Sequence, residues 1–555
     1  MNKTAKISDM GLEERLTVAG GQQGGFPVEW RDPSEADLVW EWDDMHFPQA
    51  LTTLSGDYME QALMEGVNYR YERAGMPVHT YCHAFNGYIY IADKLSIPED
   101  QLPAMRLVWK QNRQQLSREL RDYWDNRVLP SVRASYKWMR DTPIETASLL
   151  EVAEAWQRVW REALHIWGLH FMVVAGTYQS LNDLSDLYEE LIEGAQATDA
   201  LVLMQGLSAD LQRVQRDLYL LVEQARNNSA VAAGITSQKS LEVIGSVEGG
   251  AEFLRLLHEF LNEHGHLGQP FEDLAFSSWA DEPSLIIAEI RKRLDQPDLD
   301  PVSQRLRLRS QADARELEIR ERLVGRSQDL KRFETALALA QDVGPLAEDH
   351  NYWMDRMVQT HVHRFAMRVG GRLVEANVVA ESGDVFHLHV QEVEDALRAP
   401  HDMRPTVSER KADLEKWQTI KPPKYLGKPP SPPADPDRFS PVPEAQSDAN
   451  ILKGIGACVG VGRGPARVVC TPEDFERVQP GDVLVSPASN PSWVPLFSII
   501  AGLVTNTGGV LAHAAVTARE FSVPAVVGTG TATTVIKDGQ MLEVDGAAGI
   551  VRILS

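Results

Sequence analysis

His513 stands alone among alanines in residues 506–521, NTGGVLAHAAVTAREF. An imidazole is a competent nucleophile near neutral pH, because a large fraction is unprotonated and one ring nitrogen then carries a free lone pair. Gly508 and Gly509 free the backbone to turn sharply into the alanine-rich helix, and we expect His513 about one turn inside it. Amide groups and the positive dipole end at a helix N-terminus attract anions, so this setting suits a phosphoryl group on the ring. Thr507, Gly508 and Gly509 are the residues expected to stabilise that group.

The elements around His513 have the pattern of a small α/β domain. From residue 451 to 555, short apolar runs lie between glycines and prolines, which is typical of strands: ARVVC, DVLVSP, AGLVTN, PAVVG, MLEVDG and GIVRIL. One helical segment, at about residues 510–521, interrupts them. The glycine-rich GVGRGPAR at 460–467 opens a strand and not a helix, so we do not interpret it as a nucleotide-binding loop.

The chain before this domain has the pattern of long amphipathic helices. From about residue 55 to 400, apolar residues recur at three- and four-residue spacing in segments such as SLLEVAEAWQRVWREALHIW. Trp156, Trp160 and Trp167 fall on nearly one helical face, which favours a packed core, with an aromatic-binding pocket as the alternative. We assign residues 1–400 to a mainly helical domain.

A proline-rich segment separates the two parts. Nine prolines occur among the 22 residues from Pro422 to Pro443, a composition that cannot continue a helix and favours extended, semi-rigid conformations. We assign residues 401–450 to this linker and residues 451–555 to the C-terminal domain. The predicted fold class is therefore multidomain, with a large and mostly α-helical domain followed by a small α/β domain.

Composition excludes several classes of protein. The 555 residues carry a formal net charge of -24, which repels polyphosphate backbones, so we expect no nucleic-acid partner. Three cysteines in no metal-binding spacing indicate neither a disulfide framework nor a Cys/His metal site and fit a reducing compartment. The N-terminus lacks an apolar signal core, and no apolar run is long enough to span a bilayer. We expect a cytoplasmic protein with no membrane partner.

The C-terminal domain resembles a known family in its motifs. Residues 491–530, which include His513, and residues 536–554 resemble the mobile phosphohistidine domain of phosphoenolpyruvate-utilising enzymes. The resemblance implies a swivelling domain with a phosphorylatable His513, against the alternative of a structural histidine on a packed helix. Ala512 departs from the family, which commonly has Ser or Thr there, and so removes a hydroxyl that could orient the ring or the phosphate. Cys458–Val459 also departs from a frequent Ser-Pro.

The helical region is similar to the substrate-accepting central region of rifampicin phosphotransferase and related synthases. The similar segments are 26–54, 260–286 and 348–397. Within them the candidates for substrate binding, or for the base that activates an attacking hydroxyl, are His264, His266, Glu348, Asp349 and His350. Structural hydrogen bonding at helix ends explains the same residues equally well. His264-x-His266 could also ligate a metal, but spacing identifies no further ligand, so the sequence assigns no metal site.

The resemblance further implies a partner. No GxxxxGK[ST] loop occurs, and nothing before residue 55 is long enough for a nucleotide-binding module, so we expect a separate ATP-grasp-type subunit that binds ATP and Mg²⁺ and phosphorylates His513. This split arrangement resembles phenylphosphate synthase and the alkylphenol phosphate synthases, which implies a phenolic small-molecule acceptor. The alternatives are phosphorylation of an antibiotic or another hydroxylated small molecule, and a phosphocarrier protein that relays phosphate to another protein.

Overall fold

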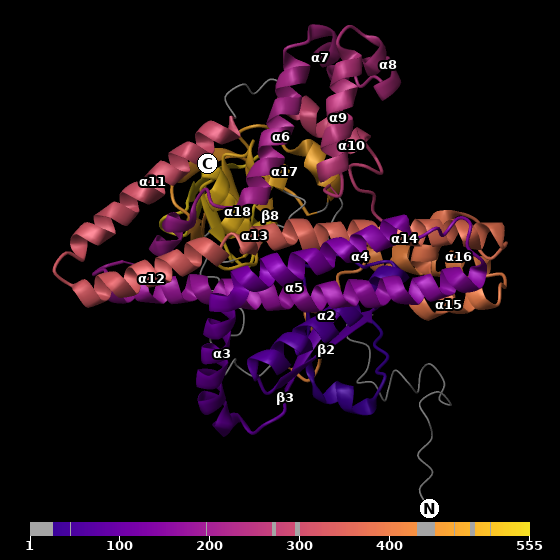
Figure 1. Cartoon of the computed structure of the whole chain (residues 1–555), viewed down its shortest axis with the longest axis horizontal. Coiled ribbons are helices and arrows are strands. Elements are labelled where there is room, and N and C mark those ends of the chain that lie inside the picture. The colour runs from indigo at the N-terminus through magenta and orange to yellow at the C-terminus, as the bar shows by residue number, and fades with distance from the viewer. Residues whose placement is uncertain are drawn as a thin grey trace, which may run out of the picture.

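The long helix α5 (Leu149–Leu191) is the central element of the fold. It begins with a capping box in which the Ser148 hydroxyl accepts from the Glu151 amide while the Glu151 carboxylate accepts from the Ser148 amide. Its apolar stripe buries Trp156, Trp160 and Trp167, so the packed-core interpretation of these tryptophans is confirmed. In Figure 1, α5 crosses the molecule between two sheets, one built from the N-terminal part of the chain and the other from the C-terminal part.

The computed structural model describes residues 26–44, 46–195, 197–268, 273–294, 300–429, 450–470, 472–488, 494–510 and 512–554. Over these residues a large and mainly helical region precedes a small α/β domain, as the sequence predicts. The helices of the first region besides α5 are α2 (Thr53–Ala74), α3 (Leu102–Tyr123), α4 (Leu129–Asp141), α6 (Ala209–Arg226), α7 (Ser229–Thr236), α8 (Leu241–Ser246), α9 (Gly250–His264), α10 (Ser284–Arg293), α11 (Pro301–Arg322), α12 (Ser327–Val343), α13 (Leu346–His350), α14 (Met357–Glu375), α15 (Val390–Arg398) and α16 (Arg404–Gln418).

The first region also contains shorter helical turns. The 3₁₀ segments are η2 (Pro33–Asp37), η3 (Glu99–Gln101), η5 (Ala197–Met204) and η7 (Ser382–His387), and the π-helical segments are η4 (Trp124–Val128) and η6 (Asn351–Arg356). The segment η6 runs directly from α13 into α14. A π-helical turn is wider than an α-helical turn and changes which residues share a face of the helix.

A four-stranded antiparallel sheet, which the helical pattern did not predict, lies within the first region. Its strands are β1 (Val39–Trp42), β2 (Val78–Phe85), β3 (Tyr88–Leu95) and β4 (Tyr425–Gly427), in the order β2-β3-β1-β4. Asn86 and Gly87, both with positive φ, form the two-residue turn between β2 and β3, the geometry that Asn-Gly favours. Helix α2 packs against β2 and also against α5, which joins this sheet to the helical core.

The predicted linker begins too early. Helix α16 starts at Arg404, with a proline in its first turn where proline is tolerated, and strand β4 pairs with β1 nearly 400 residues upstream. The prolines at 422 and 423 do not begin a free connector, because the Pro423 carbonyl accepts from the Tyr90 hydroxyl at 2.5 Å. The first region therefore extends to about residue 429, and residues 430–449 lie outside the described part of the chain.

The C-terminal domain is built on one eight-stranded mixed sheet. All six strands predicted from apolar runs are present, and the two additional strands come from the segment before them. The sheet order is β5-β12-β11-β7-β8-β9-β10-β6, with parallel pairing from β7 through β10. Its members are β5 (Ile451–Lys453), β6 (Ile455–Cys458), β7 (Val461–Val468), β8 (Val483–Ser486), β9 (Gly502–Thr505), β10 (Ala525–Val527), β11 (Met541–Asp545) and β12 (Ile550–Leu554).

The predicted single helix of this domain is α18 (His513–Phe521), which lies between β9 and β10 in the chain. Short helical segments that were not predicted also occur: η8 (Pro472–Arg477), α17 (Val494–Phe497) and α19 (Ala532–Val535). Helix α18 buries its alanines Ala514, Ala515 and Ala518 against the sheet, which lets the helix approach the strands closely. Its N-terminus is thereby fixed at the carboxyl end of β9, on the side that faces the helical region.

Candidate functional site

His513 is the first residue of α18, and not one turn inside it as the sequence suggested. Ala512 is the N-cap residue, with φ -62° and ψ 151°, and it makes no side-chain cap bond because alanine has no hydroxyl to offer. His513 therefore lies in the first helical turn, whose amides have no preceding helical turn to donate to, although the Ala515 amide donates to the Ala512 carbonyl at 2.9 Å. This position is closer to the positive end of the helix dipole than the predicted one and suits an anionic group on the ring.

The two ring nitrogens of His513 have different neighbours. The Thr517 hydroxyl, one turn further along α18, lies 3.2 Å from Nε2. Nδ1 lies 3.3 Å from Oε2 of Glu348, which comes from α13 in the helical region. Both side chains of this pair are largely buried, with 13% and 7% of their surface exposed. The 3.3 Å approach is a charge contact and not an aligned hydrogen bond, since Nδ1 of His513 has no hydrogen-bond partner among the described residues.

The contact between His513 and Glu348 joins the two parts of the chain. Four hydrogen bonds do the same: Gly206 N–H to Glu520 Oε1 at 3.2 Å, Gln205 Nε2 to the Arg519 carbonyl at 3.3 Å, Gln304 Nε2 to the Phe521 carbonyl at 2.7 Å, and Lys292 Nζ to the Phe475 carbonyl at 2.7 Å. The structure thus shows the C-terminal domain docked with its histidine against the helical region. Sequence reasoning had named Glu348 as one of several candidates but could not pair it with His513.

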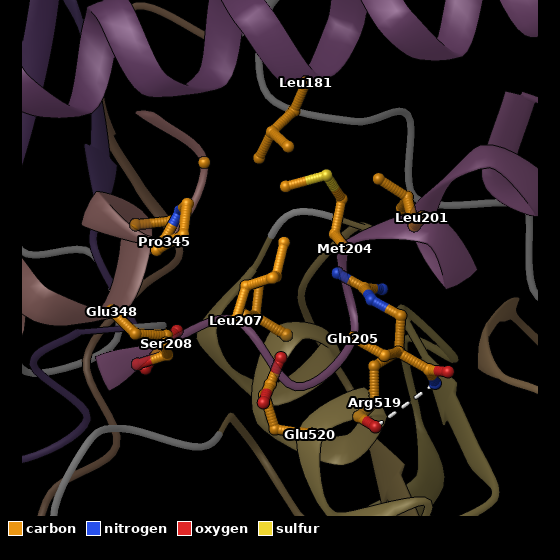
Figure 2. A pocket seen from close by; sticks show the side chains of 13 residues that line it. Leu181, Leu201, Met204, Gln205, Leu207, Ser208, Pro345, Glu348, Arg519 and Glu520 are labelled. Carbon is orange, nitrogen blue, oxygen red and sulfur yellow. Dashed lines mark hydrogen bonds between the residues drawn. The ribbon is translucent and has the colours of Figure 1, made fainter. Parts of the chain in front are cut away.

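A small cavity of about 40 Å³ lies at this boundary. Figure 2 shows Leu181 of α5 and Met204 of η5 on one side, and Arg519 and Glu520 of α18 on the other, with Glu348 at the edge. The cavity is large enough for a few water molecules. Of the His513–Glu348 pair, Glu348 lines this cavity and His513 does not.

The turn before the helix is placed as the sequence suggested, but its threonine is already engaged. Both the amide and the hydroxyl of Thr507 donate to the Pro487 carbonyl, each at 3.0 Å. Gly508 has a φ of 108°, which a side chain would strain, and the Ala512 amide donates to the Gly509 carbonyl at 3.0 Å. Stabilisation of phosphate by Thr507, Gly508 and Gly509 stays a prediction, and for Thr507 it requires a change of partner.

The other candidates lie apart from His513. His264 lies between the Tyr352 hydroxyl, 3.1 Å from Nδ1, and Asp217, 3.0 Å from Nε2, and the ring of His266 packs against Tyr352. Burial lowers the pKa of both histidines, so they are neutral near pH 7. Neither lines the cavity. These contacts favour the structural interpretation of the pair.

Asp349 and His350 also face inward. Asp349 accepts from the Ser208 hydroxyl at 3.1 Å and from the Asp210 amide at 3.2 Å, and burial raises its pKa to about 7. His350 donates from Nδ1 to the Leu346 carbonyl at 2.6 Å. Of the candidates in this segment, Glu348 is therefore the one that the structure brings to His513.

Sequence reasoning missed two charged residues at the docked boundary. Burial lowers the pKa of Arg519 to about 10, so it stays cationic, and its Nη1 donates to the Ala457 carbonyl at 3.0 Å. Burial, reinforced by the nearby Glu348 carboxylate, raises the pKa of Glu520 to about 7. No spacing rule could have identified them, because their burial depends on docking of the two regions.

Docking is expected to weaken between about pH 4.5 and pH 7. The docked state raises the pKa of Glu520 from its ordinary 4.5 to about 7, so docking favours the protonated carboxyl, is strongest below pH 4.5, and loses stability until about pH 7. The full range corresponds to up to about 3 kcal/mol. Glu520→Gln should remove this dependence. Hydrogen exchange of the Gly206 amide, compared between wild type and variant at each pH, measures it, and identical pH profiles would contradict the prediction.

Among the described helices, none combines the length and the apolar content that a membrane span requires.

Two family models match the parts of the chain that form the site. Residues 478–549 match the model described as PEP-utilising enzyme, mobile domain, and residues 169–348 match the rifampicin phosphotransferase fourth domain. The first match contains His513, and the second ends at Glu348. The pair that meets across the docked boundary therefore lies within the two matched stretches.

Individual proteins are similar over longer stretches. Chondramide synthase cmdD of Chondromyces crocatus is 28% identical over 553 residues, which cover 95% of this chain and 14% of that protein. The uncharacterized phosphotransferase YvkC of Bacillus subtilis is 27% identical over 449 residues, covering 79% and 53%, respectively. Rifampicin phosphotransferase of Streptomyces sviceus is 28% identical over 394 residues, covering 70% and 44%. The chain thus spans about half the length of these two phosphotransferases and a small part of the synthase.

Proposed function

We propose that this chain, which carries the mobile domain of the PEP-utilising enzymes and is related to the rifampicin phosphotransferases, takes up a phosphoryl group on His513 and transfers it to a hydroxyl group of a small molecule. The observation that carries the proposal is the 3.3 Å approach of Glu348 to His513 across the boundary between the two regions. A histidine that only relayed phosphate to another protein would need no buried carboxylate from a large helical region beside its ring.

The residues at this boundary can supply the phosphoryl group and take up the proton in the transfer step. The N–P bond at one ring nitrogen breaks while the acceptor oxygen forms a bond to phosphorus, and the imidazole recovers its lone pair. The proton of the acceptor hydroxyl passes to the Glu348 carboxylate, which has the chemistry of a general base.

Loading of His513 requires a different position of the domain. In the docked state Glu348 and Thr517 flank both ring nitrogens, so a phosphoryl donor cannot approach in line without the loss of at least one contact. We propose that a separate ATP-grasp-type partner binds ATP and Mg²⁺ and phosphorylates the histidine after the domain swings away. The two phosphotransferase relatives are about twice as long as the stretch that each shares with this chain, which leaves room in them for such a module.

The acceptor is proposed as a hydroxylated small molecule. The name of the rifampicin phosphotransferases supports an antibiotic-like acceptor for this chain, and the phenol suggested by the sequence belongs to the same chemical class. Both supply a hydroxyl attached to an apolar body. A panel of candidate acceptors that contains both phenols and hydroxylated antibiotics is therefore needed to identify the acceptor.

The test combines the full chain with an ATP-grasp partner, ATP, Mg²⁺ and a panel of phenols and hydroxylated antibiotics. The expected result is consumption of ATP that depends on both proteins, together with a phosphate ester of one class of acceptor. Phosphorylation of His513 without an ester from any acceptor, but with transfer to a second protein, would support the phosphocarrier alternative instead. No labelling of the chain by a demonstrably active partner would overturn the proposal.

A further inference from the structure

A second cluster of reactive side chains lies inside the helical region. His170 of α5, His350 at the end of α13 and Asp355 of η6 each offer one ligand atom, and these atoms all lie within 4.8 Å of one another. The three residues are 8%, 3% and 4% exposed, respectively. None of them contributes to the proposed transfer step. Such a concentration of imidazole and carboxylate in a buried place requires an explanation, because burial of polar and charged groups is costly unless they are paired.

The backbone is shaped so that two of these residues meet. His350 and Asp355 are five positions apart, which on an α-helix is a rotation of about 140° and would direct them to different faces. The intervening segment η6 is π-helical, with its wider i to i+5 turn, and this turn brings positions five apart onto one face. Single π-helical turns inside helices occur frequently at functional sites.

The hydrogen bonds of the cluster leave its ligand atoms available. His350 donates from Nδ1 to the Leu346 carbonyl at 2.6 Å, which leaves the lone pair on Nε2. Metal-bound histidines commonly use a backbone carbonyl in this way to fix the ring. Nδ1 of His170 and Oδ1 of Asp355 lie 2.7 Å apart, yet neither atom has an aligned hydrogen-bond partner among the described residues.

Two imidazoles and one carboxylate form a known type of donor set for divalent transition metals. Zinc takes nitrogen and carboxylate ligands at about 2.0–2.2 Å, so two ligands at a tetrahedral angle are about 3.4 Å apart. The present separations of the ligand atoms, from 2.7 Å between His170 and Asp355 up to at most 4.8 Å, bracket this value. A site with three protein ligands keeps a further coordination position for water or another ligand.

We propose that His170, His350 and Asp355 bind a divalent transition-metal ion of the zinc type. The site is distinct from His513 and does not depend on phosphoryl transfer. His350, which the sequence offered as a possible general base, is assigned to metal binding. The positive charge of the ion compensates the negative charge of the buried Asp355 carboxylate. Its three ligands link α5 and η6 to α13, the helix that carries Glu348.

The test is a binding titration of the full chain with Co²⁺ as a spectroscopic probe and with Zn²⁺ as competitor. The expected result is one equivalent of Co²⁺ with visible absorption bands of a low-coordinate site, displaced by Zn²⁺, and a rise in thermal stability that a chelator reverses. His350→Asn and Asp355→Asn should each weaken binding at least about 100-fold. His363→Asn is the matched control, because His363 is also buried and also bonds through Nδ1 to a backbone carbonyl, at 2.6 Å from Leu274.

Two results would overturn the proposal. One is the absence of Co²⁺ and Zn²⁺ binding by the folded wild-type chain, which would leave the cluster as a buried ion pair. The other is unchanged affinity in both cluster variants, which would place the ion elsewhere. Because the first measurement needs no variant, a variant that fails to fold does not prevent the test. Neither measurement requires ATP, a partner or an acceptor, so its failure is distinguishable from failure of the proposed function.

Discussion

Replacement of His513 by alanine is expected to abolish phosphorylation of the chain and to reduce acceptor phosphorylation by about four orders of magnitude or more. Loss of a nucleophile that forms a covalent intermediate typically has an effect of this size, because binding and positioning alone supply only the remaining catalysis. The ring is the only group of the first turn of α18 that can form an N–P bond. Intact-mass analysis after incubation with ATP and the partner measures the phosphoryl group directly.

The matched control is His401→Ala. His401 lies exposed on the surface, where its ring bonds to the Ala399 carbonyl at 3.0 Å, and its loss should leave labelling unchanged. Folding of the His513 variant can be checked by thermal unfolding against the wild-type chain. An acid-labile phosphoryl group on the His513 variant would show that another residue is the carrier.

Glu348→Gln should separate the two half-reactions. The variant keeps the size of the side chain but cannot take the proton of an acceptor hydroxyl, so transfer should slow by about 10² to 10⁴-fold. Loading of His513 should proceed at the wild-type rate, because we propose that it takes place after the domain has left Glu348. The phosphorylated form should therefore accumulate in the presence of acceptor, and single-turnover kinetics would resolve the two steps.

Two further substitutions serve as controls for this experiment. Glu348→Asp keeps the carboxylate and should retain part of the transfer rate. Glu409→Gln removes a carboxylate from the exposed surface of α16 and should have no effect. Equal slowing of loading and transfer in Glu348→Gln would indicate that Glu348 supports docking or folding and does not act as the base.

The C-terminal domain could be predicted in detail because its signals are local. Each strand is a short apolar run between glycine or proline, and the parallel strands β8, β9 and β10 are buried on both faces, so the runs are uninterrupted. The helix that begins at His513 follows directly from the glycine pair and the alanines. Only its start was misplaced, because Ala512 offers no side-chain cap to mark the boundary.

The sheet of the first region could not be predicted in the same way. Strand β4 is three residues long and pairs with β1, far away in the chain, and β2 does not alternate cleanly between apolar and polar residues. Its Asn-Gly turn was the local signal that could have revealed the hairpin. The linker was misplaced for the related reason that proline marks the end of a helix but does not exclude an edge strand nearby.

The pairing of Glu348 with His513 lies beyond any local pattern. The two residues come from separate regions, and their distance depends on how one region docks on the other. The same holds for His170 with His350 and Asp355, where a long helix and a π-helical turn bring three parts of the sequence together. The sequence offered His350 as one of several candidates, but only tertiary structure supplies its neighbours.

The mobile domain presents mainly its main chain to the helical region. Among the described residues, three hydrogen bonds across the boundary end on the carbonyl groups of Arg519, Phe521 and Phe475, whatever side chains those positions carry. Recognition of this kind depends on the path of the backbone and tolerates exchange of surface residues. The histidine-bearing domain is thus an interchangeable module, and a homologous domain of quite different surface sequence should still seat its histidine beside Glu348.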